Sequence, residues 1–213
     1  MRLGKTQTLN LFPTPVWVRQ LEPEAAARVN RNAMELIETF RPTASGTRAG
    51  GWTTPTNLQD RPELQELMGC VREAAADALA VLSIEHDGFL ITGCWANIKP
   101  QGAGHPSHMH PNNFLGGVYY VRAPQAGGNI LFHDPRHQPF VISPRTSERN
   151  QYNSRNADLP AREGMMLLFP AWLQHSVVGN AGENERISIS FNIMFERFGE
   201  QIAKPTWGTQ AEV

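Results

Sequence analysis

The sequence has little cysteine, almost no net charge and no long apolar run. Its two cysteines, Cys70 and Cys94, form neither a CxxC pair nor the repeated spacing of a disulfide framework, which argues against a disulfide-stabilised secreted scaffold. No stretch of about 18 apolar residues is present to span a bilayer. The first ten residues also lack the apolar core of a signal peptide. We therefore expect a cytoplasmic protein.

The chain is long enough for one domain with a sizeable core and too short for two full-size ones. Of its 213 residues, 40% are hydrophobic and 18% are charged, as in ordinary globular proteins. The formal net charge of −1 gives no overall field that would favour nucleic acid or a membrane as partner. We expect a single domain over residues 1–213.

Helical periodicity is confined to the N-terminal part, residues 1–87. Pro23 suits the first turn of a helix that continues through 25–40, and apolar residues keep helical spacing across 62–82. This helix pair leaves room for a homodimer contact. The rest of this part is predicted as an edge strand and an irregular loop, at residues 11–18 and 41–57.

From residue 88 to residue 198 the pattern changes to strands and turns. A long irregular insertion is expected at 134–162. Two helices followed by a run of antiparallel strands favour a mainly β fold, in which a closed or sandwiched β-core has the helices packed outside it. The predicted strands lie at residues 89–98, 115–121, 129–133, 165–169 and 186–195.

Four of the seven histidines form a pattern typical of a metal site. His105, His108 and His110 are close in sequence, and His175 follows an apolar strand far downstream. Side chains two residues apart on an extended segment point the same way, so His108 and His110 should face one ion. A third imidazole from a distant strand would complete one face of the metal's coordination shell and leave the opposite positions open.

The third ligand has three possible identities. Iron(II) oxygenases usually have two histidines and a carboxylate, the first pair spaced as His-x-Asp or His-x-Glu, but His108-Met-His110 has no acid. The three candidates are His110 itself, a water molecule, and Asp134 from a neighbouring strand. Three histidines also suit zinc, so these residues leave the choice between iron and zinc open.

A strand predicted over 186–195 carries one polar face. Arg186, Ser188, Ser190 and Asn192 alternate with four apolar residues, and Arg186 follows His175 by eleven positions. An arginine and a hydroxyl on one strand face can bind a carboxylate by a charge-assisted fork and a hydrogen bond. A metal face with such an arginine nearby points to an oxygen-activating iron enzyme.

Several segments resemble the 2-oxoglutarate/Fe(II)-dependent dioxygenase superfamily, and most closely a bacterial and phage group of oxygenases within it. Their order is similar to that of prolyl-hydroxylase-like members, and His108-Met-His-Pro-Asn-Asn113 is similar to the corresponding part of aspartyl/asparaginyl β-hydroxylases. The resemblance implies a double-stranded β-helix, or jelly-roll, with the metal inside one open end. The segments are 11–17, 95–113, 117–121, 127–132, 170–175 and Arg186.

The resemblance also implies roles for individual residues. His108 takes the place of the first metal ligand, His175 that of the distal ligand, and His110 that of the usual acid. Arg186 would pair with the far carboxylate of 2-oxoglutarate, assisted by Ser188. The remaining expected co-substrate contacts are Tyr119 and Asn97.

The implied activity is hydroxylation of a substrate, with Fe²⁺ as cofactor and with 2-oxoglutarate converted to succinate and CO₂. His105 and Arg136 are candidate substrate contacts, although Arg136 could instead pair with Asp134. A small molecule or a protein side chain is compatible as substrate. Two alternatives stay open: a cupin-like three-histidine enzyme that does not use 2-oxoglutarate, and a jelly-roll binding module without catalysis.

Overall fold

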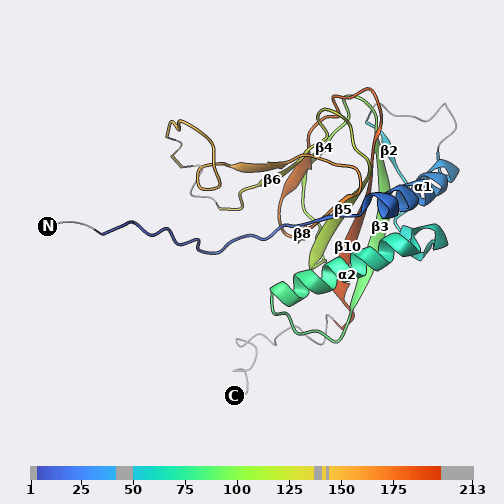
Figure 1. Cartoon of the computed structure of the whole chain (residues 1–213), viewed down its shortest axis with the longest axis horizontal. Coiled ribbons are helices and arrows are strands. Elements are labelled where there is room, and N and C mark those ends of the chain that lie inside the picture. The colour runs from blue at the N-terminus through green and yellow to red at the C-terminus, as the bar shows by residue number, and fades with distance from the viewer. Residues whose placement is uncertain (1–3, 42–49, 137–140, 143, 198–213) are drawn as a thin grey trace, which may run out of the picture.

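A computed structural model describes residues 4–41, 50–136, 141–142 and 144–197. Two antiparallel sheets form the core (Figure 1). The six-stranded sheet has the order β1-β8-β5-β10-β3-β2 and the four-stranded sheet the order β4-β9-β6-β7. The strands are β1 (Trp17–Gln20), β2 (Trp52–Thr53), β3 (Phe89–Lys99), β4 (His105–His108), β5 (Leu115–Arg122), β6 (Ile130–His133), β7 (Asn156–Leu159), β8 (Met165–Pro170), β9 (His175–Val177) and β10 (Arg186–Phe195).

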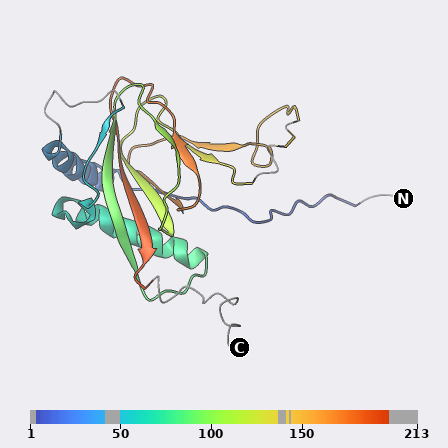
Figure 2. The ribbon, with the colours of Figure 1, turned by 180° about the vertical axis from the view of Figure 1, so that it is seen from behind.

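Two helices cover the outer face of the six-stranded sheet (Figure 1; Figure 2). Helix α1 (Pro23–Thr39) begins at the proline that predicted its start, because proline needs no hydrogen-bond partner for its nitrogen in a first turn. Helix α2 (Gln65–Val81) follows the short 3₁₀ turns η1 (Leu58–Asp60) and η2 (Pro62–Leu64). Within the described residues, no helix is both long and apolar enough to cross a bilayer.

Strict alternation along β10 divides the six-stranded sheet into two chemically different faces. Ile187, Ile189, Phe191 and Ile193 are buried in the core that the sheet shares with the helices. Residues of the opposite parity on β10 line a pocket between the two sheets. A second, smaller core fills the rest of this space with side chains from β5, β6 and β8, including Tyr120, Phe132 and Phe169. The mainly β jelly-roll expected from the sequence is confirmed.

The structure differs from the expectation in short or edge elements. Strand β1 begins only at Trp17, so most of the strand predicted at 11–18 is exposed chain outside the sheet. The insertion predicted as irregular at 134–162 contains β7, and the loop predicted at 41–57 contains β2. Strands β4 and β9, which carry two of the candidate ligands, were not predicted because each has only three or four residues and little apolar character.

Candidate metal centre

The candidate ligands lie where β4 and β9 pair at one end of the four-stranded sheet. His108, the last residue of β4, is directly opposite His175, the first residue of β9. The strands approach each other so closely that a Cβ on Gly104 would lie 2.5 Å from the Val177 carbonyl oxygen. His110 follows just beyond β4, and its backbone N–H donates to the Ala171 carbonyl oxygen at 2.9 Å. Segments 65 residues apart thereby meet.

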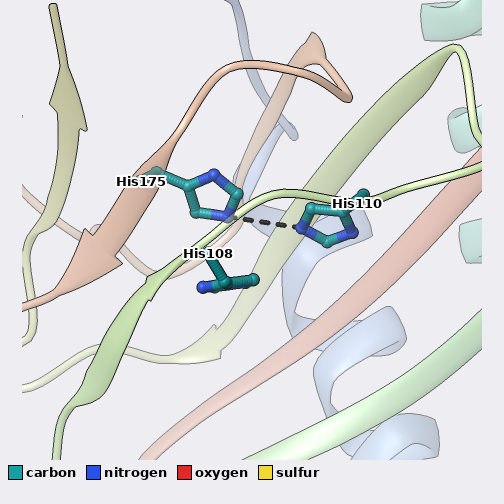
Figure 3. A group of neighbouring side chains, drawn as sticks. All are labelled: His108, His110 and His175. Carbon is teal, nitrogen blue, oxygen red and sulfur yellow. Dashed lines mark hydrogen bonds between the residues drawn. The ribbon is translucent and has the colours of Figure 1, made fainter.

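The three imidazoles converge on one point. One ring nitrogen from each of His108, His110 and His175 lies within 4.8 Å of the other two. The Nε2 atoms of His110 and His175 are 3.3 Å apart, and Figure 3 shows the rings around a common space. His110 and His175 are 8% and 3% exposed, whereas His108 is half-buried on the open side. This is the grouping that the sequence predicted.

The hydrogen bonds on the other ring nitrogens define which atoms are available to a metal. The Nδ1 atom of His108 lies 3.0 Å from the Pro106 carbonyl oxygen, and that of His175 lies 2.9 Å from the Leu173 carbonyl oxygen. A carbonyl oxygen can only accept, so each of these Nδ1 atoms carries the proton and each Nε2 carries the lone pair. The His110 Nδ1 atom faces Asn192 Oδ1 at 2.6 Å in the same way.

Three Nε2 lone pairs therefore face one another, which is unfavourable without a cation between them. Neutral imidazoles fixed by hydrogen bonds through Nδ1 are the usual form of histidine ligands in metal sites. Burial also favours the neutral form, because it lowers the pKa of His175 to about 4 and lowers the pKa of His110 below its usual value. The donor set thus fits a divalent metal ion at near-neutral pH.

Asp134 is not part of the metal centre, so that alternative for the third ligand was wrong. Both of its carboxylate oxygens accept from Arg136, whose Nη2 lies 2.7 Å from Oδ2. This ion pair lowers the pKa of Asp134 and leaves Arg136 on the surface, away from the pocket. The alternative pairing of Arg136 with Asp134 is therefore correct, and Arg136 does not line the pocket.

A buried arginine lies along the pocket from the histidines. Arg186 is 2% exposed; its Nε donates to the Gly128 carbonyl oxygen and its Nη1 to Ser188 Oγ, both at 3.0 Å. The Tyr120 ring lies under the guanidinium carbon at 5.0 Å. Among the described residues, no carboxylate forms an ion pair with Arg186. A buried cation without a counterion is costly, so this end of the pocket favours an anionic ligand.

The turn before β6 is built to hold that guanidinium. Gly128 has a φ of +67°, and a Cβ at this position would lie 2.9 Å from the Arg186 Cδ atom. A side chain would therefore be strained by the backbone and would also displace the arginine. The Gly-Gly turn in the sequence thus supports the polar end of the pocket.

The remaining predicted residues divide between the pocket and the opposite face of the six-stranded sheet. Asn97 and His105 line the pocket; Asn97 donates to Ser190 Oγ at 3.0 Å, and the His105 ring packs edge-on against His108 at 4.4 Å. Tyr119 lies on the opposite face, where its hydroxyl donates to Asn30 Oδ1 at 2.7 Å. The expected contact between Tyr119 and the co-substrate is therefore wrong.

The sequence analysis assigned no role to three residues in or beside the pocket. Tyr120 rather than Tyr119 faces Arg186, and its fully buried hydroxyl has no hydrogen-bond partner within the described part of the chain. Asn192 holds His110, and Lys99 lines the pocket opposite Arg186. Only Asn192 carried a signal in the sequence, because it lies on the polar face of the strand predicted over 186–195. The pairings that place Lys99 and Tyr120 opposite Arg186 and Ser188 are defined by the fold.

The pocket encloses about 290 Å³ and has a positive lining. Its walls carry Arg186, Lys99 and four histidines, and among the described residues no aspartate or glutamate. Apolar side chains of Val118, Ile130 and Phe169 close its inner wall. The pocket thus has three converging histidines that could hold a metal, a fixed guanidinium at another position, and an apolar wall.

Comparison with known proteins gives a family match over the segment that carries this pocket. Residues 93–192 match the model of a family described as "Putative 2OG-Fe(II) oxygenase". No curated protein matches the chain.

Solved structures share the fold at low sequence identity. The chain is similar to the non-heme alpha ketoglutarate dependent epimerase SnoN from nogalamycin biosynthesis (TM-score 0.63, 15% identity, 85% of this chain and 77% of that one). It is also similar to a prolyl-4-hydroxylase from Pseudomonas putida (0.59, 12%, 85% and 93%). A third similar structure is HygX from Streptomyces hygroscopicus with nickel and 2-oxoglutarate bound (0.59, 12%, 86% and 84%).

Proposed function

We propose, from the premise that residues 93–192 belong to the family of 2OG-Fe(II) oxygenases, that this chain is a 2-oxoglutarate-dependent dioxygenase with a three-histidine iron centre. The observation that carries the proposal is the buried Arg186, which has no carboxylate partner among the described residues and lies in the same pocket as the three converging Nε2 atoms.

The three histidines would hold Fe(II) through Nε2. Their Nδ1 atoms donate to Pro106, Leu173 and Asn192, so each ring is locked with its lone pair toward the ion. When bound, Fe(II) and 2-oxoglutarate supply an O₂-dependent oxidation in which 2-oxoglutarate becomes succinate and CO₂ and the substrate is hydroxylated. Three neutral ligands leave the ion at +2, and the carboxylate at the metal-binding end of 2-oxoglutarate would balance one of these charges.

Arg186 would bind the distal carboxylate of 2-oxoglutarate. Gly128 and Ser188 take two of its N–H groups and fix the guanidinium plane, so the remaining N–H groups are pre-oriented for a ligand. The unpartnered Tyr120 hydroxyl beside it supports a polar ligand at this end. HygX, similar in fold, has nickel and 2-oxoglutarate bound, which supports the same pair of ligands here.

The apolar wall of the pocket would exclude water, and its open side would admit the substrate. Val118, Ile130 and Phe169 exclude water from the inner side of the pocket. His108 and Met109, half-buried and 54% exposed, lie on the open side where a substrate enters. Proteins similar in fold include a prolyl-4-hydroxylase and an epimerase from nogalamycin biosynthesis, so we propose a small molecule or a peptide side chain as substrate.

The proposal is tested by 2-oxoglutarate turnover in the Fe(II)-reconstituted protein. Succinate formation in the presence of O₂ should be detectable for the wild-type chain. Arg186→Ala should lower the affinity for 2-oxoglutarate about 10- to 100-fold, the range for losing a charged hydrogen bond. Arg136→Ala is the matched control, because Arg136 lies outside the pocket.

Three results would reject the proposal. Succinate formation that is equally fast in Arg186→Ala and wild type would indicate that 2-oxoglutarate does not use this arginine. Stoichiometric iron binding without any 2-oxoglutarate turnover or binding would favour a three-histidine enzyme that uses no keto acid. Absence of iron binding would favour a binding module without catalysis.

A further inference from the structure

Lys99 is a second cation at the same end of the pocket as Arg186. It is the last residue of β3 and lies directly opposite Arg186 in the register between β3 and β10. Directly opposed residues of an antiparallel pair extend from the same sheet face, with Cβ atoms about 5 Å apart. Both side chains line the pocket. The register therefore places two positive groups beside each other, although like charges at opposed positions are unfavourable.

Neither charge is balanced by an acid in the part of the chain that the structure describes. The Lys99 ammonium donates to the Gly50 carbonyl oxygen at 3.0 Å, which uses one of its three protons. Among the residues that the structure describes, no carboxylate pairs with Lys99 or with Arg186, and none lines the pocket. Burial and the neighbouring guanidinium of Arg186 lower the pKa of Lys99, as expected when two cations share a confined space.

We propose that Lys99 and Arg186 together bind the distal carboxylate of 2-oxoglutarate, with Lys99 as a second, specificity-determining contact. The inference rests on the proposed function, in which 2-oxoglutarate is the co-substrate. A carboxylate has two oxygens and about four lone-pair sites, so it can accept from an ammonium and a guanidinium at once. Its negative charge would relieve the repulsion between the two cations, which neither Gly50 nor Ser188 can do.

The same geometry argues against Lys99 as a contact for an anionic primary substrate. Met109 is 54% exposed beside the histidines, where we expect substrate to approach, whereas Lys99 lies opposite Arg186 in the register between β3 and β10. His105 also lines the pocket, and its ring packs edge-on against that of His108 at 4.4 Å. Lys99 is thus placed at the carboxylate end of a ligand that reaches from the metal to Arg186.

The test is an anaerobic titration of the Fe(II) protein with two 2-oxo acids, followed by charge-transfer absorption and by calorimetry. 2-Oxoglutarate carries the distal carboxylate, and 2-oxopentanoate has the same metal-binding group and chain length without it. Lys99→Met should lower the affinity for 2-oxoglutarate on the order of tenfold or more, the loss expected for one charged hydrogen bond. The same substitution should leave the affinity for 2-oxopentanoate unchanged. Lys99→Arg should retain most of the affinity for 2-oxoglutarate.

Lys5→Met is the matched control, because Lys5 is exposed near the N-terminus. This variant should bind both acids as the wild type does. Equal weakening of both acids by Lys99→Met would indicate a structural role and overturn the proposal. Unchanged affinity for both acids would also overturn it and leave Lys99 available to the substrate. If wild-type protein binds iron but shows no response to 2-oxoglutarate, the proposed function itself fails, which is a distinguishable result.

Discussion

The Nδ1 atom of His110, just beyond β4, lies 2.6 Å from the side-chain oxygen of Asn192 on β10. The register of β10 against β3 shifts immediately after Asn192. Such irregularities re-aim side chains near functional sites. This one contact decides the tautomer of His110 and points its Nε2 toward His175. Asn192 is therefore a positioning residue for the metal centre.

Removing this support should weaken metal binding without removing a ligand. Asn192→Ala should lower metal affinity about 10- to 100-fold, the usual effect of losing a hydrogen bond that orients a histidine ligand. Asn192→Asp retains an acceptor and should recover much of the affinity. Competition with a chelator, measured at constant pH, gives both values. Equal affinity in Asn192→Ala and wild type would show that His110 does not bind the ion.

Substitution of the third ligand separates the possible metal faces. His110→Ala should lose more than about 100-fold in metal affinity, because it removes a ligand and not merely its support. His110→Asp should still bind one ion per chain, since a carboxylate is the usual third ligand in iron(II) oxygenases. Asp134→Asn should bind metal as the wild type does, because Asp134 is paired with Arg136. Strong metal loss in Asp134→Asn, measured by metal analysis after anaerobic loading, would contradict the three-histidine assignment.

The two neighbouring tyrosines form a natural matched pair. Tyr119→Phe should lower the free energy of unfolding by about 1 kcal/mol, because the buried bond to Asn30 is lost, and should leave 2-oxoglutarate affinity unchanged. Tyr120→Phe removes a hydroxyl that has no partner, so stability should hardly change while 2-oxoglutarate affinity falls. Urea denaturation and ligand titration on both variants check this. Lower 2-oxoglutarate affinity in Tyr119→Phe, with unchanged affinity in Tyr120→Phe, would indicate that Tyr119 contacts the co-substrate.

Stability of the metal-free protein should fall in mildly acidic solution. Burial lowers the pKa of His175 and of His105 to about 4, whereas an unfolded histidine titrates near about 6.5. Between these values the unfolded chain binds more protons, so the free energy of unfolding decreases as pH falls from about 6.5 to about 4. Urea denaturation with a chelator present, at several pH values, measures this. In His175→Gln the decrease should be smaller, and an identical pH profile would refute the assignment.

Much of the fold followed from periodicity in long elements. Helix α1 began at Pro23 as predicted, and β10 matched its predicted bounds because ten alternating residues give a strong signal. Short strands were not found: β4 and β9 are recognised by their partners rather than by their own sequence. Their pairing depends on backbone contacts between residues about 70 positions apart, which no local pattern encodes.

The site was predicted in its ligands and less well in its surroundings. The spacing of His108, His110 and His175 predicted that they share one face, and the structure brings one ring nitrogen of each within 4.8 Å of the other two. Tyr119 was chosen over Tyr120 because two adjacent tyrosines look alike until strand parity is known. Lys99 was missed because its partner across the sheet is set by a register that only the folded structure defines.

The most direct measurement is a crystal structure of the anaerobic complex with Mn(II), as a redox-stable substitute for iron, and 2-oxoglutarate. One ion should be bound by the Nε2 atoms of His108, His110 and His175, and the co-substrate should extend from that ion with its distal carboxylate at the Arg186 guanidinium. An ion held by other side chains, or a co-substrate lying away from Arg186, would contradict the account.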